Sequence, residues 1–250
     1  DEFRSLECGG ALISSRVVLT AAHCLKSDDG SFLHAKAVTA MFTIQGEIDF
    51  SISTVQWVYK YGDGKGGDDI AMILLPDPVP FICEQNNDER IDERFVSIIR
   101  LPIDNFVDTF NVWDDEQFEY GECKIFSYGG SENDSHLHTT LKKVSSFSIN
   151  NHSFIGFRNK LDNSSEISIC EGDSGSPLIC IRNDVKYVIG VAAFTAGRNN
   201  KTRALCAGDV GADRFGFFED IRQHLNWIRK ELVSYALLDT LRQDYRKCGF

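Results

Sequence analysis

The chain has no long hydrophobic run, no excess of basic residues and no Cys-x-x-Cys pair. Its longest apolar stretches, such as residues 70–75, are far shorter than the roughly 20 residues that a membrane-spanning helix needs. The 37 Asp and Glu residues outnumber the 26 Lys and Arg residues, which gives a formal net charge of −11. These features argue against a membrane partner and against nucleic acid as the main partner.

The composition that is present indicates a secreted globular protein. The 250 residues are 42% hydrophobic and 25% charged, which is enough for one large or two small compact domains. Eight dispersed cysteines fit disulfides formed in an oxidising compartment and show no zinc-site spacing. Four Asn-x-Ser/Thr sequons are consistent with secretion and predict glycosylation at Asn133, Asn151, Asn163 and Asn200.

Strand-like patterns fill most of the first two hundred residues, and only the end of the chain has a helical pattern. Runs rich in β-branched and aromatic residues are separated by Ser, Gly and Asp turns. Ile48, Phe50 and Ile52, for example, alternate with polar residues. From 219 to about 246 the apolar residues follow helical spacing. The pattern predicts an all-β body in two halves, followed by one C-terminal α-helix.

Three short motifs contain the residue types that acyl transfer by a serine requires. Ser174 lies in "SICEGDSGSP", His23 in "LTAAHC" and Asp69 in "DIAMILL". Alone, each has a common structural explanation as a loop hydroxyl, a surface imidazole or a strand-end carboxylate. In acyl transfer a base takes the serine proton, a carboxylate orients that base, and backbone N–H groups bind the oxyanion.

Together these motifs resemble the chymotrypsin/trypsin family of serine proteases, and they occur in the family's order of His, Asp and Ser. The resemblance extends from Cys8 to about Trp227, nearly the whole chain. It implies an all-β fold of two six-stranded antiparallel β-barrels and a C-terminal α-helix. The first barrel is expected within residues 1–112, the second within 113–220, and the helix and tail within 221–250.

The resemblance also implies roles for individual residues. His23 would be the general base, Asp69 its orienting carboxylate and Ser174 the nucleophile, with the N–H groups of Gly172 and Ser174 forming the oxyanion hole. Asp173 would pair with the amino terminus that an activating cleavage frees in this family. The chemistry requires no metal or cofactor, and no acidic ligand set for calcium is evident.

The family's disulfide pattern can be carried over to six of the eight cysteines. It implies the pairs Cys8–Cys24, Cys123–Cys180 and Cys170–Cys206. Cys83 and Cys248 remain, and their pairing would tie the C-terminal helix to the first barrel. The alternative is that one or both are free or bonded to a missing segment.

Three positions match the family's specificity pocket. Ser168 stands at its base, where a carboxylate would select Arg or Lys, so trypsin-like cleavage is not expected. Thr195 stands where the family usually has glycine and is expected to narrow the entrance. The other wall position is Gly216 and is expected to stay open. Together they predict a preference for an uncharged P1 side chain of small to medium size.

Several departures leave more than one interpretation open. Ala193 replaces the serine that bonds the family's catalytic aspartate, and Ser176 replaces a glycine where positive φ would be costly for serine. The segment 1–7 contains no Ile-Val-Gly-Gly sequence, so Asp173 is expected to lack its usual partner.

The first interpretation is a secreted, monomeric serine endopeptidase that acts on peptides or proteins and is bound by protein inhibitors. The second is an inactive homologue that serves as a binding module. The third is a fragment of a longer protease.

Overall fold

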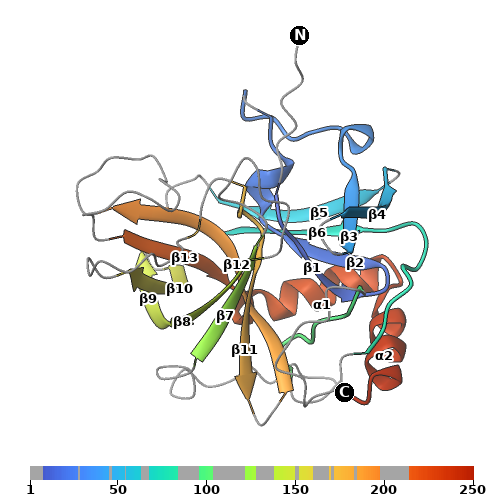
Figure 1. Ribbon diagram of the computed structural model, residues 1–250. Helices are drawn as coiled ribbons and strands as arrows, with labels where there is room; N and C mark the ends of the chain where they lie inside the picture. The colour runs from blue at the N-terminus through green and yellow to red at the C-terminus, as the bar shows by residue number, and fades with distance from the viewer. Residues whose placement is uncertain are drawn as a thin grey trace.

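The computed structural model describes residues 8–27, 29–44, 47–53, 55–62, 68–83, 96–103, 122–127, 138–149, 152–159, 169, 172–182, 185–197 and 214–250. Two groups of antiparallel strands lie side by side, followed by helices at the C-terminal end (Figure 1). None of the helices in this described part is long and apolar enough to cross a membrane.

The described residues of the first half form six strands in two sheets. A four-stranded sheet has the order β1-β2-β6-β5, and β3 pairs with β4 in a separate two-stranded sheet. The strands are β1 (Ala11–Ser14), β2 (Val17–Thr20), β3 (Ala40–Ile44), β4 (Glu47–Ile52), β5 (Gln56–Tyr61) and β6 (Asp69–Leu74). Short 3-10 helices, η1 (Ala22–Leu25) and η2 (Ala35–Ala37), follow β2 and precede β3.

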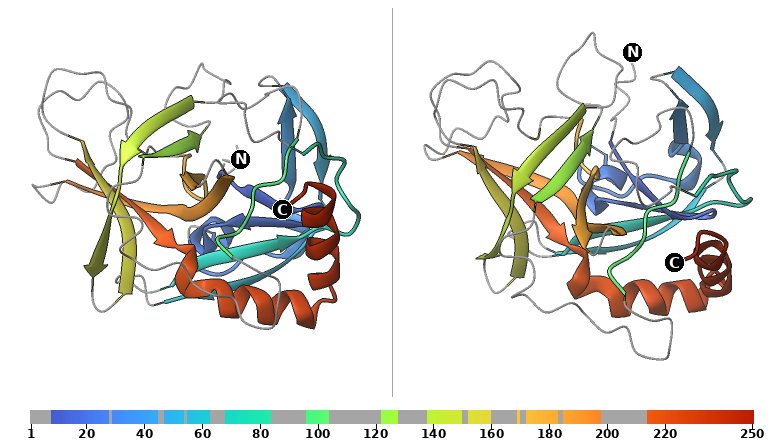
Figure 2. Two further views of the ribbon diagram at one scale, coloured as in Figure 1. Left: turned by 90° about the horizontal axis from the view of Figure 1, so that it is seen from below. Right: turned by 60° about the horizontal axis from the view of Figure 1, so that its bottom comes forward.

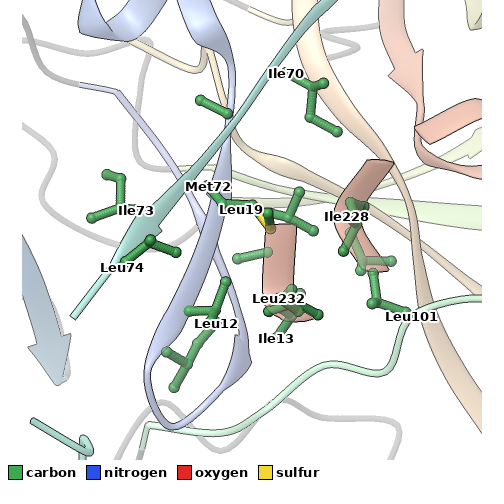
Figure 3. Close-up of a cluster of buried hydrophobic side chains, with 14 of the residues drawn as sticks. Leu12, Ile13, Leu19, Ile70, Met72, Ile73, Leu74, Leu101, Ile228 and Leu232 are labelled. Carbon is green, nitrogen blue, oxygen red and sulfur yellow. The ribbon is translucent and has the colours of Figure 1, made fainter. Parts of the chain in front are cut away.

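The core of the first half is built around β6, which lies between two neighbouring strands. Its residues from Ile70 to Leu74 are all buried, because apolar side chains on both faces of the strand are covered. Leu12, Leu19 and Met72 gather there with Ile228 and Leu232 from the C-terminal region (Figure 3). The C-terminal region therefore covers the first sheet.

The second half contains a sheet of order β8-β7-β11-β12-β13-β10-β9. Its two end strands, β8 and β9, are separated in the chain only by Val144, so one bent segment pairs at both ends of the sheet and closes it. With that segment counted once, six stretches of chain form the barrel. The bounds are β7 (Glu122–Ser127), β8 (His138–Lys143), β9 (Ser145–Ile149), β10 (His152–Asn159), β11 (Pro177–Arg182), β12 (Val185–Gly197) and β13 (Arg214–Asp220).

The expected single C-terminal helix is two helices in the structure. A 3-10 turn, η4 (Ile221–His224), leads into α1 (Leu225–Ser234), and α2 (Leu238–Lys247) follows at an angle (Figure 2). The break lies at Ala236, whose φ of 55° is left-handed and cannot continue a right-handed helix. The apolar spacing continues through this break, which is why the sequence predicted one helix.

The second helix is fastened to the first half by polar and covalent contacts. Asp244 Oδ2 accepts a hydrogen bond from the Ser15 backbone N–H at 2.7 Å. The Tyr245 hydroxyl accepts one from the Leu101 N–H at 2.8 Å. The disulfide Cys83–Cys248 links the end of α2 to the first half of the chain.

Three of the four expected disulfides are present in the structure. Cys123 and Cys180 lie directly opposite each other on β7 and β11, which explains their pairing. The expected Cys170–Cys206 pair and the four sequons lie outside the described residues. The three disulfides present are Cys8–Cys24, Cys83–Cys248 and Cys123–Cys180.

Candidate active site

The pairing of β2 with β6 brings His23 and Asp69 to the same end of the first sheet. Thr20, the last residue of β2, lies opposite Ala71 of β6. Asp69 precedes Ala71 by two residues, and His23 follows Thr20 by three, within η1. Because the strands are antiparallel, the end of β2 and the start of β6 lie at the same end of the sheet, and the two side chains meet there.

Asp69 holds His23 through both of its carboxylate oxygens. Oδ2 lies 2.7 Å from His23 Nδ1, and Oδ1 accepts a hydrogen bond from the His23 backbone N–H at 2.9 Å. A carboxylate oxygen accepts, so Nδ1 carries the proton and Nε2 is left with a free lone pair. The imidazole is therefore held in the tautomer that a general base requires.

This two-point contact compensates for the replacement at Ala193. That residue lacks the hydroxyl that supports the aspartate in the family. Here the His23 backbone N–H occupies Oδ1 and His23 Nδ1 occupies Oδ2, so both Asp69 oxygens are engaged without it. The side chain of His23 is 30% exposed and that of Asp69 is 16% exposed, which leaves the imidazole accessible from outside.

Ser174 lies in a tight turn that packs against the start of η1. Gly175, with a φ of 83°, donates its N–H to the Ala192 carbonyl at 2.8 Å. A Cβ at Gly175 would lie 2.3 Å from Thr20 Oγ1 and 3.2 Å from the Ala21 nitrogen. Only glycine permits this approach, and it brings the serine turn beside the residues that lead to His23.

The Ser174 backbone is held by a hydrogen bond, whereas its hydroxyl is not hydrogen-bonded to the His23 imidazole among the described residues. The Ser174 carbonyl accepts a hydrogen bond from the Gly9 N–H at 2.7 Å. Among the described residues, no hydrogen bond joins the Ser174 hydroxyl to His23 Nε2. Such catalytic hydrogen bonds are often long before substrate binds and tighten in the complex.

Within the described part of the chain, the N–H groups of Gly172 and Ser174 have no backbone acceptor, whereas those of Gly175 and Ser176 donate to Ala192 and Asp173. Gly172 has a φ of 95°, a backbone conformation that favours glycine. Two such amides are the groups that an oxyanion hole requires.

The expected backbone cost at Ser176 does not arise. Ala236 alone among the described non-glycine residues has positive φ, so Ser176 adopts an ordinary conformation. Its side chain is 2% exposed and fits because Gly9 has no side chain. A Cβ on Gly9 would lie 2.1 Å from Ser176 Oγ.

The expectation that Asp173 lacks its usual amino-terminal partner stays a prediction, because residues 1–7 lie outside the described residues. The Asp173 side chain is buried, with 1% exposure, and it is not without an interaction in the structure. Its carbonyl accepts a hydrogen bond from the Ser176 N–H at 2.9 Å.

Two of the three predicted pocket residues face each other across paired strands. Thr195 of β12 lies opposite Gly216 of β13. A Cβ at Gly216 would lie 2.5 Å from the ring of Phe157 and 3.0 Å from Ile169 Cδ1. The space beside Gly216 is thus filled by these side chains, contrary to the expectation of an open wall. Ser168 lies outside the described residues.

The fold and this arrangement of residues define a two-barrel protein of the serine-protease type. The model of the trypsin family matches residues 2–208, so the chain belongs to that family. It is 25% identical over 244 residues to tissue-type plasminogen activator of Sus scrofa, covering 89% of this chain and 38% of that protein. It is 24% identical over 236 residues to coagulation factor XI of Bos taurus, covering 88% and 32%.

A third relative is closer to this chain in length. Testisin of Homo sapiens is 26% identical over 257 residues, covering 92% of this chain and 71% of that protein. The chain therefore spans little more than a third of the plasminogen activator and about a third of factor XI.

Sequence reasoning missed a second group of imidazoles and carboxylates. Asp68, His152, Glu219 and His224 place one ligand-type atom each within 4.8 Å of one another. They come from three separate parts of the chain, with Glu219 and His224 only five residues apart, so no motif in the sequence identifies the group. The only local signal is that Asp68 directly precedes Asp69.

Proposed function

We propose that this chain is a secreted serine endopeptidase that hydrolyses peptide bonds through an acyl-enzyme. The observation that carries the proposal is the contact between both Asp69 oxygens and His23, which fixes the imidazole with Nε2 free. Membership of the trypsin family supports the same chemistry. Peptide or protein substrates, and protein inhibitors that present a similar segment, are the expected partners of a monomer.

The proposed reaction begins with the Ser174 hydroxyl. His23 Nε2 takes its proton as Oγ attacks the scissile carbonyl carbon, and the negative charge moves to the carbonyl oxygen. The N–H groups of Gly172 and Ser174 stabilise that oxyanion. The imidazolium then protonates the leaving amine, which leaves an acyl group on Ser174. Water, activated by the same imidazole, hydrolyses the ester and restores the serine.

We further propose a preference for an uncharged P1 side chain of small to medium size. Phe157 and Ile169 occupy the space beside Gly216, and Thr195 carries a side chain opposite it. Large aromatic side chains would compete with the Phe157 ring for that space. A set of peptide substrates that differ only at P1 would test this, with Ala and Val expected to exceed Phe and Arg in kcat/KM.

Labelling by a fluorophosphonate probe tests the proposed activity itself. An activated serine attacks phosphorus, fluoride leaves, and the proton passes to His23. We expect wild-type protein to be labelled and Ser174→Ala to remain unlabelled, with circular dichroism showing that both are folded. If folded wild-type protein is neither labelled nor able to hydrolyse peptides, the result would instead favour the binding module. The absence of a hydroxyl at position 193 supports that interpretation.

A further inference from the structure

Four ionisable side chains from both halves of the molecule converge next to the candidate catalytic residues. Asp68 directly precedes β6, His152 begins β10, Glu219 lies near the end of β13, and His224 ends η4. The pairing of Phe154 with Glu219 brings β10 and β13 together at this point. One ligand-type atom of each of the four residues lies within 4.8 Å of those of the others.

The hydrogen bonds of Glu219 set the direction of both imidazoles. Glu219 Oε1 lies 2.6 Å from His152 Nε2 and 2.5 Å from His224 Nε2. With Oε1 as the acceptor of both bonds, each Nε2 carries a proton and each Nδ1 keeps a lone pair. A carboxylate that binds the far nitrogen of an imidazole is the usual outer support of a metal-binding histidine.

Both free nitrogens lie near one oxygen of Asp68. Its Oδ1 lies 4.0 Å from His152 Nδ1 and 3.8 Å from His224 Nδ1. Three acceptor atoms thus lie close together. In a tetrahedral zinc site, bonds of 2.0–2.2 Å place neighbouring ligand atoms about 3.4 Å apart, so small side-chain movements would complete the set.

Two buried atoms of this cluster have no hydrogen-bond partner among the residues that the structure describes. They are His224 Nδ1 and Glu219 Oε2. The side chain of His224 is 1% exposed and that of Glu219 is 0% exposed, so bulk solvent does not cover these atoms. A buried polar atom without a partner is costly, which indicates that something else satisfies these atoms.

One positively charged side chain already contacts the cluster and would compete with a bound ion. Lys60 is the competing charge, with its Nζ 3.1 Å from the other Asp68 oxygen, Oδ2.

We propose that Asp68, His152 and His224 bind one Zn²⁺ ion, with Glu219 orienting the two imidazoles and water completing the coordination. Two imidazole nitrogens with a carboxylate suit zinc, whereas calcium requires six to eight oxygens. Asp68 is 33% exposed and provides the path by which the ion enters. No metal centre was expected from the sequence, and the proposed site is independent of the proposed hydrolysis.

Direct titration with ZnCl₂ tests this site without reference to activity. Wild-type protein freed of metal by a chelator is titrated calorimetrically, and its zinc content is then measured by mass spectrometry. We expect one tight site per chain. His152→Asn and Glu219→Gln should each weaken binding at least tenfold. Co²⁺ in place of zinc should give the visible absorption of a four-coordinate site, and His152→Asn should remove it.

Two control variants separate this site from other imidazoles. His34→Asn changes an exposed histidine outside the cluster and should leave zinc binding unchanged. His23→Ala removes the candidate catalytic imidazole and should also leave the tight site intact.

Glu219→Gln changes a fully buried residue, whereas His152 is 14% exposed, so His152→Asn decides the matter if the first variant does not fold. The proposal is overturned if wild-type protein binds no zinc up to about 100 µM. It is equally overturned if folded His152→Asn binds as tightly as wild type, or if His23→Ala abolishes binding.

Discussion

Two groups of imidazoles and carboxylates lie next to each other in this protein, and burial separates what each can do. His23, 30% exposed, is held by both oxygens of Asp69. His224 and Glu219 are almost completely buried and keep atoms without partners. An accessible imidazole with one free nitrogen can exchange a proton with a substrate. A buried imidazole can reach only something as small as an ion.

The two groups are joined in the chain by adjacent aspartates. Asp69 contacts His23, whereas Asp68 faces His152 and His224 and bonds Lys60. A change at one aspartate is therefore expected to act on one group and leave the other. This makes the pair a direct test of whether the two groups have separate functions.

Exchanging each aspartate for asparagine should give opposite results. Asp69→Asn is expected to lower kcat by about 10⁴-fold, the loss seen in the template of this chemistry, because an amide favours the wrong imidazole tautomer. Zinc affinity should remain within about threefold of wild type, since Asp69 is no ligand. Asp68→Asn should weaken zinc binding while keeping most hydrolysis. Peptide hydrolysis and calorimetric titration of both variants measure this.

The same two variants can also contradict the view that the two groups have separate functions. If Asp68→Asn abolishes hydrolysis in a folded protein, the two groups act as one unit. If Asp69→Asn leaves hydrolysis intact, His23 is not held by this carboxylate during the reaction.

Local sequence predicted the first group much better than the second. The motifs around His23, Asp69 and Ser174 placed these residues at strand ends and turns, and the two-barrel fold they implied is confirmed. The catalytic roles themselves remain predictions. Each motif carries its own turn chemistry, so its local structure follows from a few neighbouring residues.

The features that sequence did not predict depend on pairing between distant segments. Glu219 meets His152 because β13 pairs with β10 in one register, and a composition pattern does not specify that register. The filling of the pocket wall beside Gly216 by Phe157 depends on the same pairing. The break at Ala236 was hidden because apolar spacing continues across it.

A fully satisfied buried group gives a reference for the unsatisfied one. The Tyr245 hydroxyl accepts from Leu101 N–H at 2.8 Å and donates to the Ile99 carbonyl at 3.4 Å. Tyr245→Phe leaves the buried Leu101 donor unpaired and should lower the free energy of unfolding by about 1–3 kcal/mol. Denaturant unfolding measures this loss, and kcat/KM of the folded variant should be unchanged. An unchanged stability would mean that water replaces the hydroxyl.

Metal-free protein should lose stability as pH rises from about 6.5 to 8. The folded-state pKa of Glu219, about 8, lies above its ordinary 4.5, so its contribution to stability is present at low pH and is lost as pH rises. The folded-state pKa of His224, about 4, lies below its ordinary 6.5, so its contribution is lost as pH falls. The two slopes oppose each other below pH 6.5, and only that of Glu219 remains above it.

The change in unfolding free energy with pH that Glu219 causes has an upper limit, and a Glu219 variant measures it. One proton changes stability by at most about 1.4 kcal/mol per pH unit, so Glu219 accounts for at most about 2 kcal/mol between pH 6.5 and 8. Glu219→Gln, unfolded by denaturant with a chelator present, should have a flatter profile than wild type in this window. Parallel profiles would show that Glu219 is ionised in the folded protein over the whole range.

The smallest expected effect concerns Lys60, which shares Asp68 with the proposed ion. Its side chain is 37% exposed, and such surface ion pairs contribute about 0–1 kcal/mol. Lys60→Met removes a positive charge and frees Asp68 Oδ2, so zinc affinity should rise about two- to fivefold. The gain should shrink as salt is added, because the charge is near the surface. Lys36→Met, at an exposed position outside the cluster, is the matched control. A loss of affinity in Lys60→Met alone would mean that Lys60 positions Asp68 for the ion instead of competing with it.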